Sequence, residues 1–483
     1  MIARWRTAQD LERRRPRHAV WEFTLSCNLK CRHCGSRAGA PRDDELSTAE
    51  ALALVDDLAA AGVREITLIG GEAYLRRDWL EIVAAIRRHD IYCDIQTGGR
   101  ALTREKLAAA AEAGLDGVGV SIDGPEEIHD DIRGVPGSFR QALSVVRNAR
   151  ALGLAVSANS QVNALTRGAL DALFDILVAE GVTHWQPMLT VPMGNAVENE
   201  RLLLQPHDLL RVIPKLSELC LRAKARGMVV TASNTIGYFG PHERHFRGLA
   251  QAERHWKGCE AAATGIGIEA DGTIKGCPSL ETRKFGMGHV RERAFADIWR
   301  DGEPVRRRKS GAAEDQPNFC NVCYHRDTCA SGCSWQADSV TGDLRNNPFC
   351  HYRALRLATH RLRERVAKVE EAAPLPFAVG RFAVILEDQN GAPAGAEAWD
   401  RVAADEIAKR AGVPAGDMLL CASCDQFFYA GHADCPHCAA PVGEDERRDQ
   451  IGTLEAYRAM DFLRDRLGEL GVPLAHDENP APA

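Results

Sequence analysis

Residues 21–34 read WEFTLSCNLKCRHC, an apolar strand-like run that leads directly into three cysteines at C-x3-C-x2-C spacing. These thiols, Cys27, Cys31 and Cys34, are expected on a loop at the point where the strand ends. Four thiolates complete a cubane iron–sulfur cluster, so three would leave one iron without a protein ligand. Zinc is the alternative, but it needs a fourth ligand, and His33 is poorly placed between its neighbours.

Strand-like and helix-like runs alternate from His18 to about Thr190. The expected strands are Ala19–Leu25, Glu65–Ile69, Ile91–Gln96, Gly117–Ser121, Leu154–Gln161 and Thr183–Leu189. Amphipathic segments such as Thr48–Ala61 and Arg77–Arg88 separate them. The expected N-caps are Ser47 or Thr48 and Thr103, and the expected helix stops are Gly62 and Gly114. This alternation predicts an α/β fold, a partial (β/α)6 TIM-like barrel.

Polar and glycine residues follow the expected strands, where the chemistry of a parallel sheet is built. They are Gly70, Gly71 and Glu72 after the second strand, Ser121 and Asp123 at the fourth, and Gln161 at the fifth.

Residues 21–34 and the Gly-Gly-Glu turn together resemble the radical S-adenosylmethionine (SAM) superfamily. The resemblance implies a [4Fe–4S] cluster whose open iron chelates SAM, followed by reductive cleavage of SAM to methionine and a 5′-deoxyadenosyl radical. It also implies that Glu72 and the backbone near Gly70 hold the methionine moiety, and that Ser121 and Asp123 contact the ribose or the neighbouring substrate. Ser-Ile-Asp-Gly is equally a common turn composition. Relatives often carry an aromatic residue at the position of His33 and Asn at the position of Gly98. Neither position is an iron ligand.

A second set of seven cysteines occupies a loop-rich stretch from about Trp256 to Tyr352. They are Cys259, Cys277, Cys320, Cys323, Cys329, Cys333 and Cys350. Seven thiols are more than the four that one cubane cluster binds, and an odd number of thiols does not divide evenly among four-coordinate zinc sites. The array resembles the SPASM domain of many radical SAM enzymes, and this resemblance implies two auxiliary clusters. By it Cys259, Cys277 and Cys333 hold the first cluster, and the other four cysteines hold the second. A zinc ribbon is the alternative, although it leaves three cysteines idle.

The first auxiliary cluster therefore lacks a fourth thiolate. The expected ligand is Glu260, Asp271, water or the substrate itself. If the ligand is a substrate thiolate, the iron would hold its sulfur in position and would also accept the electron that is released when a thioether forms.

The third set is Cys421-x2-Cys424-x10-Cys435-x2-Cys438. Paired C-x-x-C turns with a short spacer are typical of structural zinc. A rubredoxin-like iron or another cluster is the alternative. This small zinc-ribbon-like unit lies outside the usual radical SAM–SPASM pattern.

The composition is that of a soluble globular protein, with 45% hydrophobic and 26% charged residues in 483. A net charge of −7 does not indicate a protein that binds nucleic acid. No membrane segment or signal peptide is expected. The 16 cysteines then indicate metal binding in the cytoplasm, where thiols stay reduced. Cys93 and Cys220 stand apart from the three sets and are expected in the core.

Six regions are expected along the chain. They are a basic lead (1–17), the barrel (18–240), the SPASM domain (256–355), a helical and linker region (356–410) that starts in a helical run His351–Glu371 and has Pro374 and Pro376, the four-cysteine unit (411–445), and a helix with a disordered tail (446–483). The basic lead is either a solvated charge run or a site for an acidic leader.

We interpret the chain as an enzyme that modifies a ribosomally made peptide or protein by thioether formation, carbon–carbon crosslinking or side-chain oxidation. A precursor peptide and a reductant such as flavodoxin or ferredoxin are the expected partners. One alternative is chemistry on a small molecule or tetrapyrrole, because haem-pathway relatives share the Cys-Asn-Leu-Lys-Cys style of loop. Another is a non-catalytic electron-transfer protein, although such a protein need not keep the Gly-Gly-Glu turn. The sequence identifies no catalytic acid or base.

Overall fold

The computed structural model describes residues 7–247, 255–309 and 318–469, and in these its largest element is a ten-stranded sheet in the order β10-β9-β8-β1-β2-β3-β4-β5-β6-β7. Its six central strands run parallel: β1 (His18–Thr24), β2 (Glu65–Gly70), β3 (Tyr92–Thr97), β4 (Gly117–Ser121), β5 (Ala155–Val162) and β6 (His184–Leu189). The predicted α/β partial barrel is confirmed, and every strand end lies within one residue of its expected position.

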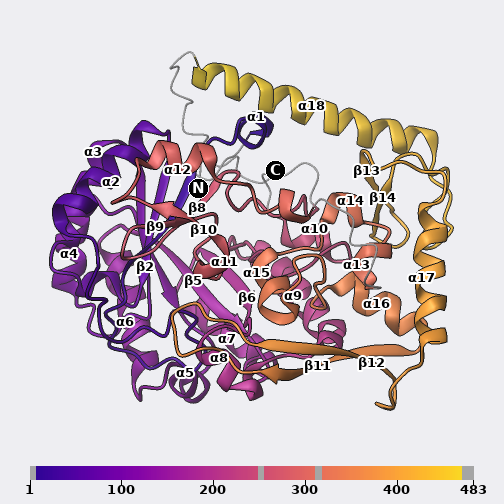
Figure 1. Ribbon diagram of the computed structural model, residues 1–483, viewed down its shortest axis with the longest axis horizontal. Helices are drawn as coiled ribbons and strands as arrows, with labels where there is room; N and C mark the ends of the chain where they lie inside the picture. The colour runs from indigo at the N-terminus through magenta and orange to yellow at the C-terminus, as the bar shows by residue number, and fades with distance from the viewer. Residues whose placement is uncertain (1–6, 248–254, 310–317, 470–483) are drawn as a thin grey trace.

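Helices connect these strands and cover one side of the sheet, as Figure 1 shows for α2, α3, α4 and α6. They are α2 (Thr48–Ala60), α3 (Trp79–Arg88), α4 (Arg104–Glu112), α5 (Glu126–Arg133), α6 (Ser138–Ala151), α7 (Leu170–Ala179), α8 (Asn195–Glu198) and α9 (Leu209–Lys224). The Ser47 and Thr103 side chains cap α2 and α4, and Gly62 and Gly114 follow these helices with positive φ. The start and stop residues in the sequence therefore fix the helix ends. Cys93 and Cys220 are buried in the core that these helices form.

The sheet continues beyond the six expected strands on both sides. The short strand β7 (Val229–Val230) pairs with β6, while β8 (Gly265–Ile268) pairs in parallel with β1. The antiparallel strands β9 (Thr273–Lys275) and β10 (Gly286–His289) complete that edge. The second cysteine region is thus hydrogen-bonded directly to the strand that precedes Cys27.

Short helices and loops make up most of the second cysteine region. They are α10 (Glu243–Phe246), α11 (Thr282–Phe285), α12 (Phe295–Asp301), α13 (Phe319–Val322), α14 (Arg326–Cys329), α15 (Ser334–Thr341) and α16 (His351–Thr359).

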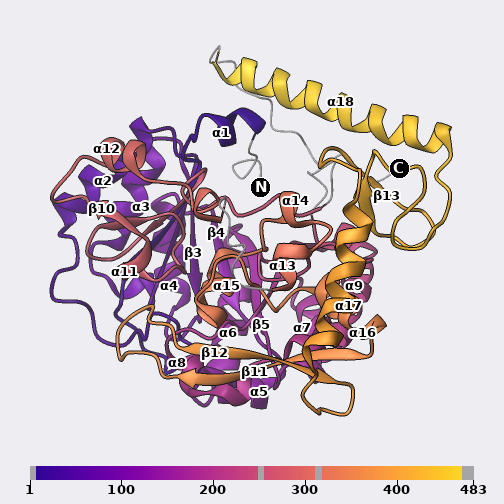
Figure 2. The ribbon, with the colours of Figure 1, turned by 45° about the vertical axis from the view of Figure 1, so that its right-hand side comes forward.

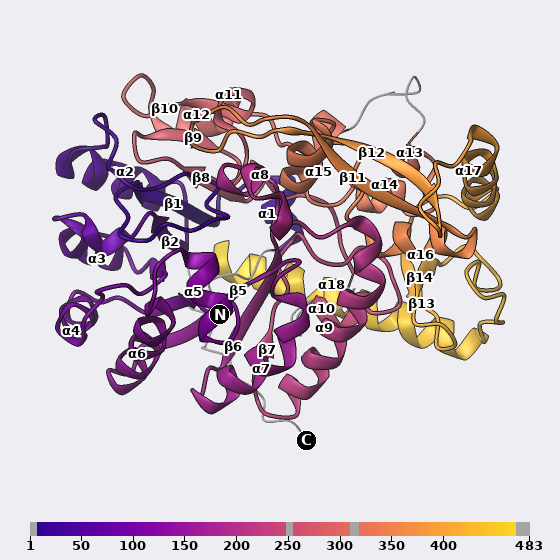
Figure 3. The same cartoon turned by 90° about the horizontal axis from the view of Figure 1, so that it is seen from below.

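The helical run expected over His351–Glu371 is wrong in its second half. Helix α16 ends at Thr359, and the chain continues as an antiparallel hairpin of β11 (Leu362–Glu370) and β12 (Arg381–Asp388). The first residues of β11 alternate between buried and half-buried, the period-2 pattern of a strand. The two prolines expected in a linker lie in the hairpin connection, where a missing N–H does not interrupt the ladder. Figure 3 shows this hairpin running from beside α8 toward α17.

The C-terminal region consists of α17 (Ala396–Arg410), a small hairpin of β13 (Met418–Leu420) and β14 (Phe427–Tyr429), and the long helix α18 (Glu444–Glu469). Figure 2 shows α18 running back over the molecule to α1 (Ala8–Glu12). There the Ala8 N–H donates to the Asp461 carboxylate at 2.7 Å. The expected disordered tail from 475 lies outside the described residues, as does most of the basic lead's first half. Among the described helices, none has the length and apolar character needed to span a bilayer.

Candidate active site

A cavity of about 310 Å³ lies at the carboxyl ends of the barrel strands. Its wall holds the three cysteines of the first set together with Gly70, Gly71, Glu72, Ser121 and Gln161. Residues from four loops that are far apart in sequence thus meet at one edge of the sheet, as expected for a parallel fold.

The cysteine loop is fixed by backbone hydrogen bonds on both sides. The Cys27 N–H donates to the Gly39 carbonyl at 2.9 Å, and the Asn195 side chain donates to the Cys31 carbonyl at 3.0 Å. Burial raises the pKa of Cys27 to about 12 and that of Cys31 to about 11. Because the thiolate is the form that binds metal, binding of a cluster here would release these protons.

The Gly70-Gly71-Glu72 turn passes so close to the cysteine loop that both glycines are required. A Cβ on Gly70, whose φ is +137°, would lie 2.1 Å from the Thr24 carbonyl oxygen, and one on Gly71 would lie 2.1 Å from that of Ser26. This close approach brings Glu72 to the cavity beside the cysteines.

Glu72 presents a buried carboxylate with few counter-charges. It is 1% exposed and accepts hydrogen bonds from the Thr97 hydroxyl and from the Gly98 N–H, the latter at 2.8 Å. Burial raises its pKa to about 7. A carboxylate held this way is ready to pair with an ammonium group, which would restore its charge.

Ser121 and Gln161 face the cavity, whereas Asp123 lies behind its wall. The Asp123 carboxylate is fully buried, accepts two hydrogen bonds from Arg133 at 2.7 and 3.1 Å, and accepts the Gln161 N–H at 2.9 Å. Burial opposes ionisation, but Arg133 outweighs it and lowers the pKa of Asp123 to about 2. Asp123 therefore orients the wall and does not face the cavity.

Sequence reasoning missed Arg133, which lines the cavity at the end of α5. Its guanidinium lies 3.9 Å from the Cys31 sulfur, and Asp123 raises its pKa against the effect of burial. A fixed cation beside a ligand sulfur stabilises the thiolate. No motif contained this residue, because its position depends on how α5 packs under the cysteine loop.

The far wall comes from regions after the barrel: Ser279, Trp335 and Phe377. The Phe377 N–H donates to the Gly35 carbonyl at 3.0 Å, and the Lys275 ammonium lies 3.8 Å from the Phe377 ring centroid. The hairpin connection expected as a plain linker is therefore part of the cavity.

The seven cysteines of the second set separate into two groups in space. Burial and then repulsion from Cys259 raise the pKa of Cys333 to about 12, with Cys277 adding to the effect. Burial likewise raises the pKa of Cys277 to about 11, and Cys259 adds to it. These three thiols are mutual neighbours, as the SPASM resemblance implied.

The other four, Cys320, Cys323, Cys329 and Cys350, line a single small cavity. The Arg353 guanidinium lies 3.9 Å from the Cys320 sulfur. The two groups match the ligand sets expected for two auxiliary clusters.

The first of these groups adjoins the main cavity through Ser279, which hydrogen-bonds to the Cys277 sulfur. The two protein carboxylates considered as a fourth ligand have other partners. Glu260 accepts from the Thr264 hydroxyl at 3.0 Å, and Asp271 accepts from the Thr273 N–H at 2.8 Å. Ser279 thus lies between the cavity and the first group of thiols.

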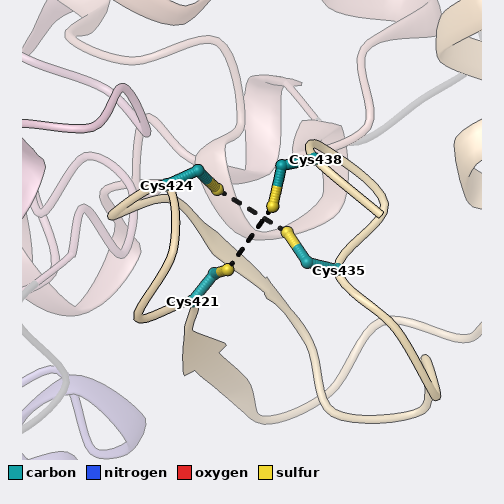
Figure 4. A group of neighbouring side chains, drawn as sticks. All are labelled: Cys421, Cys424, Cys435 and Cys438. Atoms are coloured by element: carbon teal, nitrogen blue, oxygen red, sulfur yellow. Dashed lines mark hydrogen bonds between the residues drawn. The ribbon is translucent and has the colours of Figure 1, made fainter. Parts of the chain in front are cut away.

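The third set forms a compact tetrad, shown in Figure 4. The sulfurs of Cys421 and Cys438 are 3.7 Å apart, as are those of Cys424 and Cys435. A tetrahedron with Zn–S distances of about 2.3 Å has edges of about 3.8 Å. The four thiols therefore fit one tetrahedral metal ion, and they are too close together to bind the separate irons of a cubane.

A sequence model of the radical SAM superfamily matches residues 21–164, and one of the SPASM iron-sulfur cluster-binding domain matches residues 259–324. The chain therefore carries a radical SAM domain and a SPASM domain. This pairing implies SAM binding and [4Fe–4S] clusters. The first cysteine set and the two groups of the second set offer places for clusters, and the cavity offers a place for SAM.

Relatives of this radical SAM–SPASM enzyme include the AdoMet-dependent heme synthase of Nitratidesulfovibrio vulgaris, 29% identical over 70% of this chain and 93% of the relative. The PqqA peptide cyclase of Granulibacter bethesdensis is 27% identical over 74% of this chain and 92% of the relative. The fold is similar to that of Streptococcus suis SuiB bound to precursor peptide SuiA, with a TM-score of 0.52 at 14% identity over 70% of this chain and 77% of SuiB.

Proposed function

We propose that this radical SAM–SPASM enzyme oxidises a side chain or α carbon of a ribosomally made peptide or protein. The product would be a thioether, a carbon–carbon crosslink or an oxidised side chain. The observation that carries this proposal is the size and charge of the cavity.

Pockets for drug-sized molecules measure roughly 300–1,000 Å³. At about 310 Å³, the cavity would be largely filled by SAM and the cluster on its three cysteines. A substrate would then reach SAM at the cavity mouth, where one side chain needs less room than a macrocycle, which would require the Phe377 wall to move.

Charge favours the same conclusion. Arg133 is the one Lys or Arg in the cavity wall that the described residues form, and Asp123 already pairs with it. Porphyrin carboxylates would find no spare cation there, while a neutral peptide side chain needs none.

The chain's own residues then take the following roles. Cys27, Cys31 and Cys34 hold the SAM-binding cluster, Glu72 accepts the SAM ammonium, and Gln161 offers a polar contact. When bound, SAM and this cluster would supply a 5′-deoxyadenosyl radical for abstraction of one hydrogen atom from a substrate C–H bond, and the cysteines of the second set would hold clusters able to take up the second electron. Ser279 links the cavity to the Cys277 sulfur, and the substrate's proton leaves to solvent.

Location and partners follow from this chemistry. Every one of the sixteen cysteines is free, as metal binding requires and as the reducing cytoplasm maintains. The partners are a precursor peptide and a one-electron reductant such as flavodoxin or ferredoxin.

The test is transfer of a label. Reduced anaerobic enzyme receives SAM and peptides encoded beside its gene, each deuterated at one residue type. Deuterium should appear in 5′-deoxyadenosine, and the peptide should lose two hydrogens by mass spectrometry. A Glu72→Gln enzyme is the control. Label transfer from none of the peptides, with turnover of a porphyrin, would overturn the proposal.

Tetrapyrrole chemistry is the second candidate, and the match to the AdoMet-dependent heme synthase over nearly its whole length favours it. The same assay with iron-coproporphyrin III as the probe decides between the two. Decarboxylation coupled to 5′-deoxyadenosine formation would support this second candidate.

A further inference from the structure

We propose that the C-terminal four-cysteine unit, together with α17, forms a wall behind the loop that carries Cys323 of the second auxiliary cluster, and that its metal ion keeps that wall in place. This proposal rests on the assignment of Cys320, Cys323, Cys329 and Cys350 to that cluster. It is independent of the substrate.

The first observation is that the two metal regions share one apolar core. Cys323 and Cys329 belong to the same buried cluster of side chains as Cys421 and Cys435 of the tetrad. The four-cysteine unit is thus not an appended module connected by a flexible linker.

The second observation is a set of contacts on the two residues that follow Cys323. The Tyr324 hydroxyl accepts the Tyr429 N–H of β14 at 2.8 Å. The His325 ring stacks on that of His437, with centroids 5.5 Å apart. His437 lies between Cys435 and Cys438 in the tetrad, so its ring position depends directly on the metal knuckle.

Helix α17 supplies the third contact. Its Glu406 carboxylate is fully buried, accepts the Tyr324 N–H at 3.0 Å, and accepts the Tyr352 hydroxyl at 2.9 Å. One backbone group and three side-chain groups near Cys323 are therefore held from outside the SPASM domain.

The metal-binding turns are the part of the wall that depends on metal. The unit expected over 411–445 has too few residues for an independent core, and the β13–β14 hairpin has three-residue strands. Metal loss should release Tyr429 and His437 together and open the Cys323 side of the cluster to water and oxygen. Groups that support ligands in this way typically alter metal retention about 10- to 100-fold.

The experiment uses full-length enzyme in which the three cysteines of the SAM-binding loop are Ala, so that the remaining iron is auxiliary. Release of iron to a ferrous chelator and decay of the auxiliary EPR signals in air are compared among variants. Cys424→Ser/Cys438→Ser removes the metal, His437→Ala keeps all four thiols, and Cys220→Ala is the matched control, because it removes a buried thiol outside every set.

We expect about half of the auxiliary iron to leave at least about tenfold faster in the double variant. His437→Ala should keep its zinc and show a smaller acceleration, and Cys220→Ala should match the parent. If the double variant does not fold, His437→Ala decides. Release equal to the parent in both would overturn the proposal. A parent that holds no auxiliary iron would instead overturn the ligand assignment.

Discussion

Replacing Glu72 with Gln isolates the charge of the proposed SAM-ammonium site. The Gln oxygen can still accept the Gly98 N–H, and its amide can donate to the Thr97 oxygen, since a hydroxyl both donates and accepts. The substitution therefore keeps the shape and the hydrogen bonds of this buried position and removes only the negative charge.

A hydrogen bond to a charged group contributes about 1.5–3 kcal/mol. At about 1.4 kcal/mol per tenfold, Glu72→Gln should weaken SAM binding by roughly 10- to 150-fold. The pH dependence supplies a second signature. With its pKa raised to about 7, Glu72 in the free enzyme is protonated below that pH, so SAM affinity should fall as pH drops through 7. The Gln variant should lose this part of the dependence.

The assay is calorimetric titration of SAM into anaerobic, cluster-loaded enzyme between pH 6 and 8, with iron content as the control for an intact cluster. An affinity within about threefold of the parent, with the same pH profile, would refute the reasoning.

The remaining predictions concern the metals and the cavity wall. Changing all three cysteines of the SAM-binding loop to Ala should abolish 5′-deoxyadenosine formation and leave the auxiliary iron in place; cleavage of SAM at the parent rate would contradict this. Reconstituted enzyme should contain about twelve irons and about one zinc, and Cys421→Ser/Cys424→Ser should remove the zinc; metal analysis showing about four irons and two or more zincs would exclude the two auxiliary clusters. A cysteine peptide, but not its Ser variant, should perturb the EPR signal of the first auxiliary cluster, and an unchanged signal with a peptide that is modified would exclude direct thiolate ligation. Phe377→Ala should let bulkier side chains react and raise their kcat/KM relative to small ones, and an unchanged preference would show that Phe377 does not limit size.

The barrel was predictable because its strands and caps are local signals. Strong apolar runs fixed β1 to β6, and residues such as Ser47 and Gly62 fixed helix ends. The first and third cysteine sets were predictable from their close spacing, whereas the division of the second set into two groups rested on the resemblance to the SPASM domain.

Other features depend on tertiary packing and left no such signal. Nothing in the sequence near Arg133 indicates that α5 lies under the cysteine loop, and the alternation in β11 is partly hidden by its many charged residues. Phe377 reaches the cavity only because its hairpin folds back to Gly35. Asp123 was expected in the cavity because it ends a strand motif, but the pairing with Arg133 turns its carboxylate behind the wall.

The pairing of β8 with β1 has a mechanical consequence for electron transfer. Cys27 follows β1, Cys259 precedes β8, and Cys277 follows β9, so the first two clusters are attached to neighbouring strands of a single sheet. Electron tunnelling slows steeply with distance, and a hinge between two domains would make its rate fluctuate with every opening. Here the separation is set by a ladder of backbone hydrogen bonds within one sheet, and no hinge lies between the two strands. The sheet thereby sets the spacing between the cysteine loop of the first set and the first group of the second set while substrate enters and leaves.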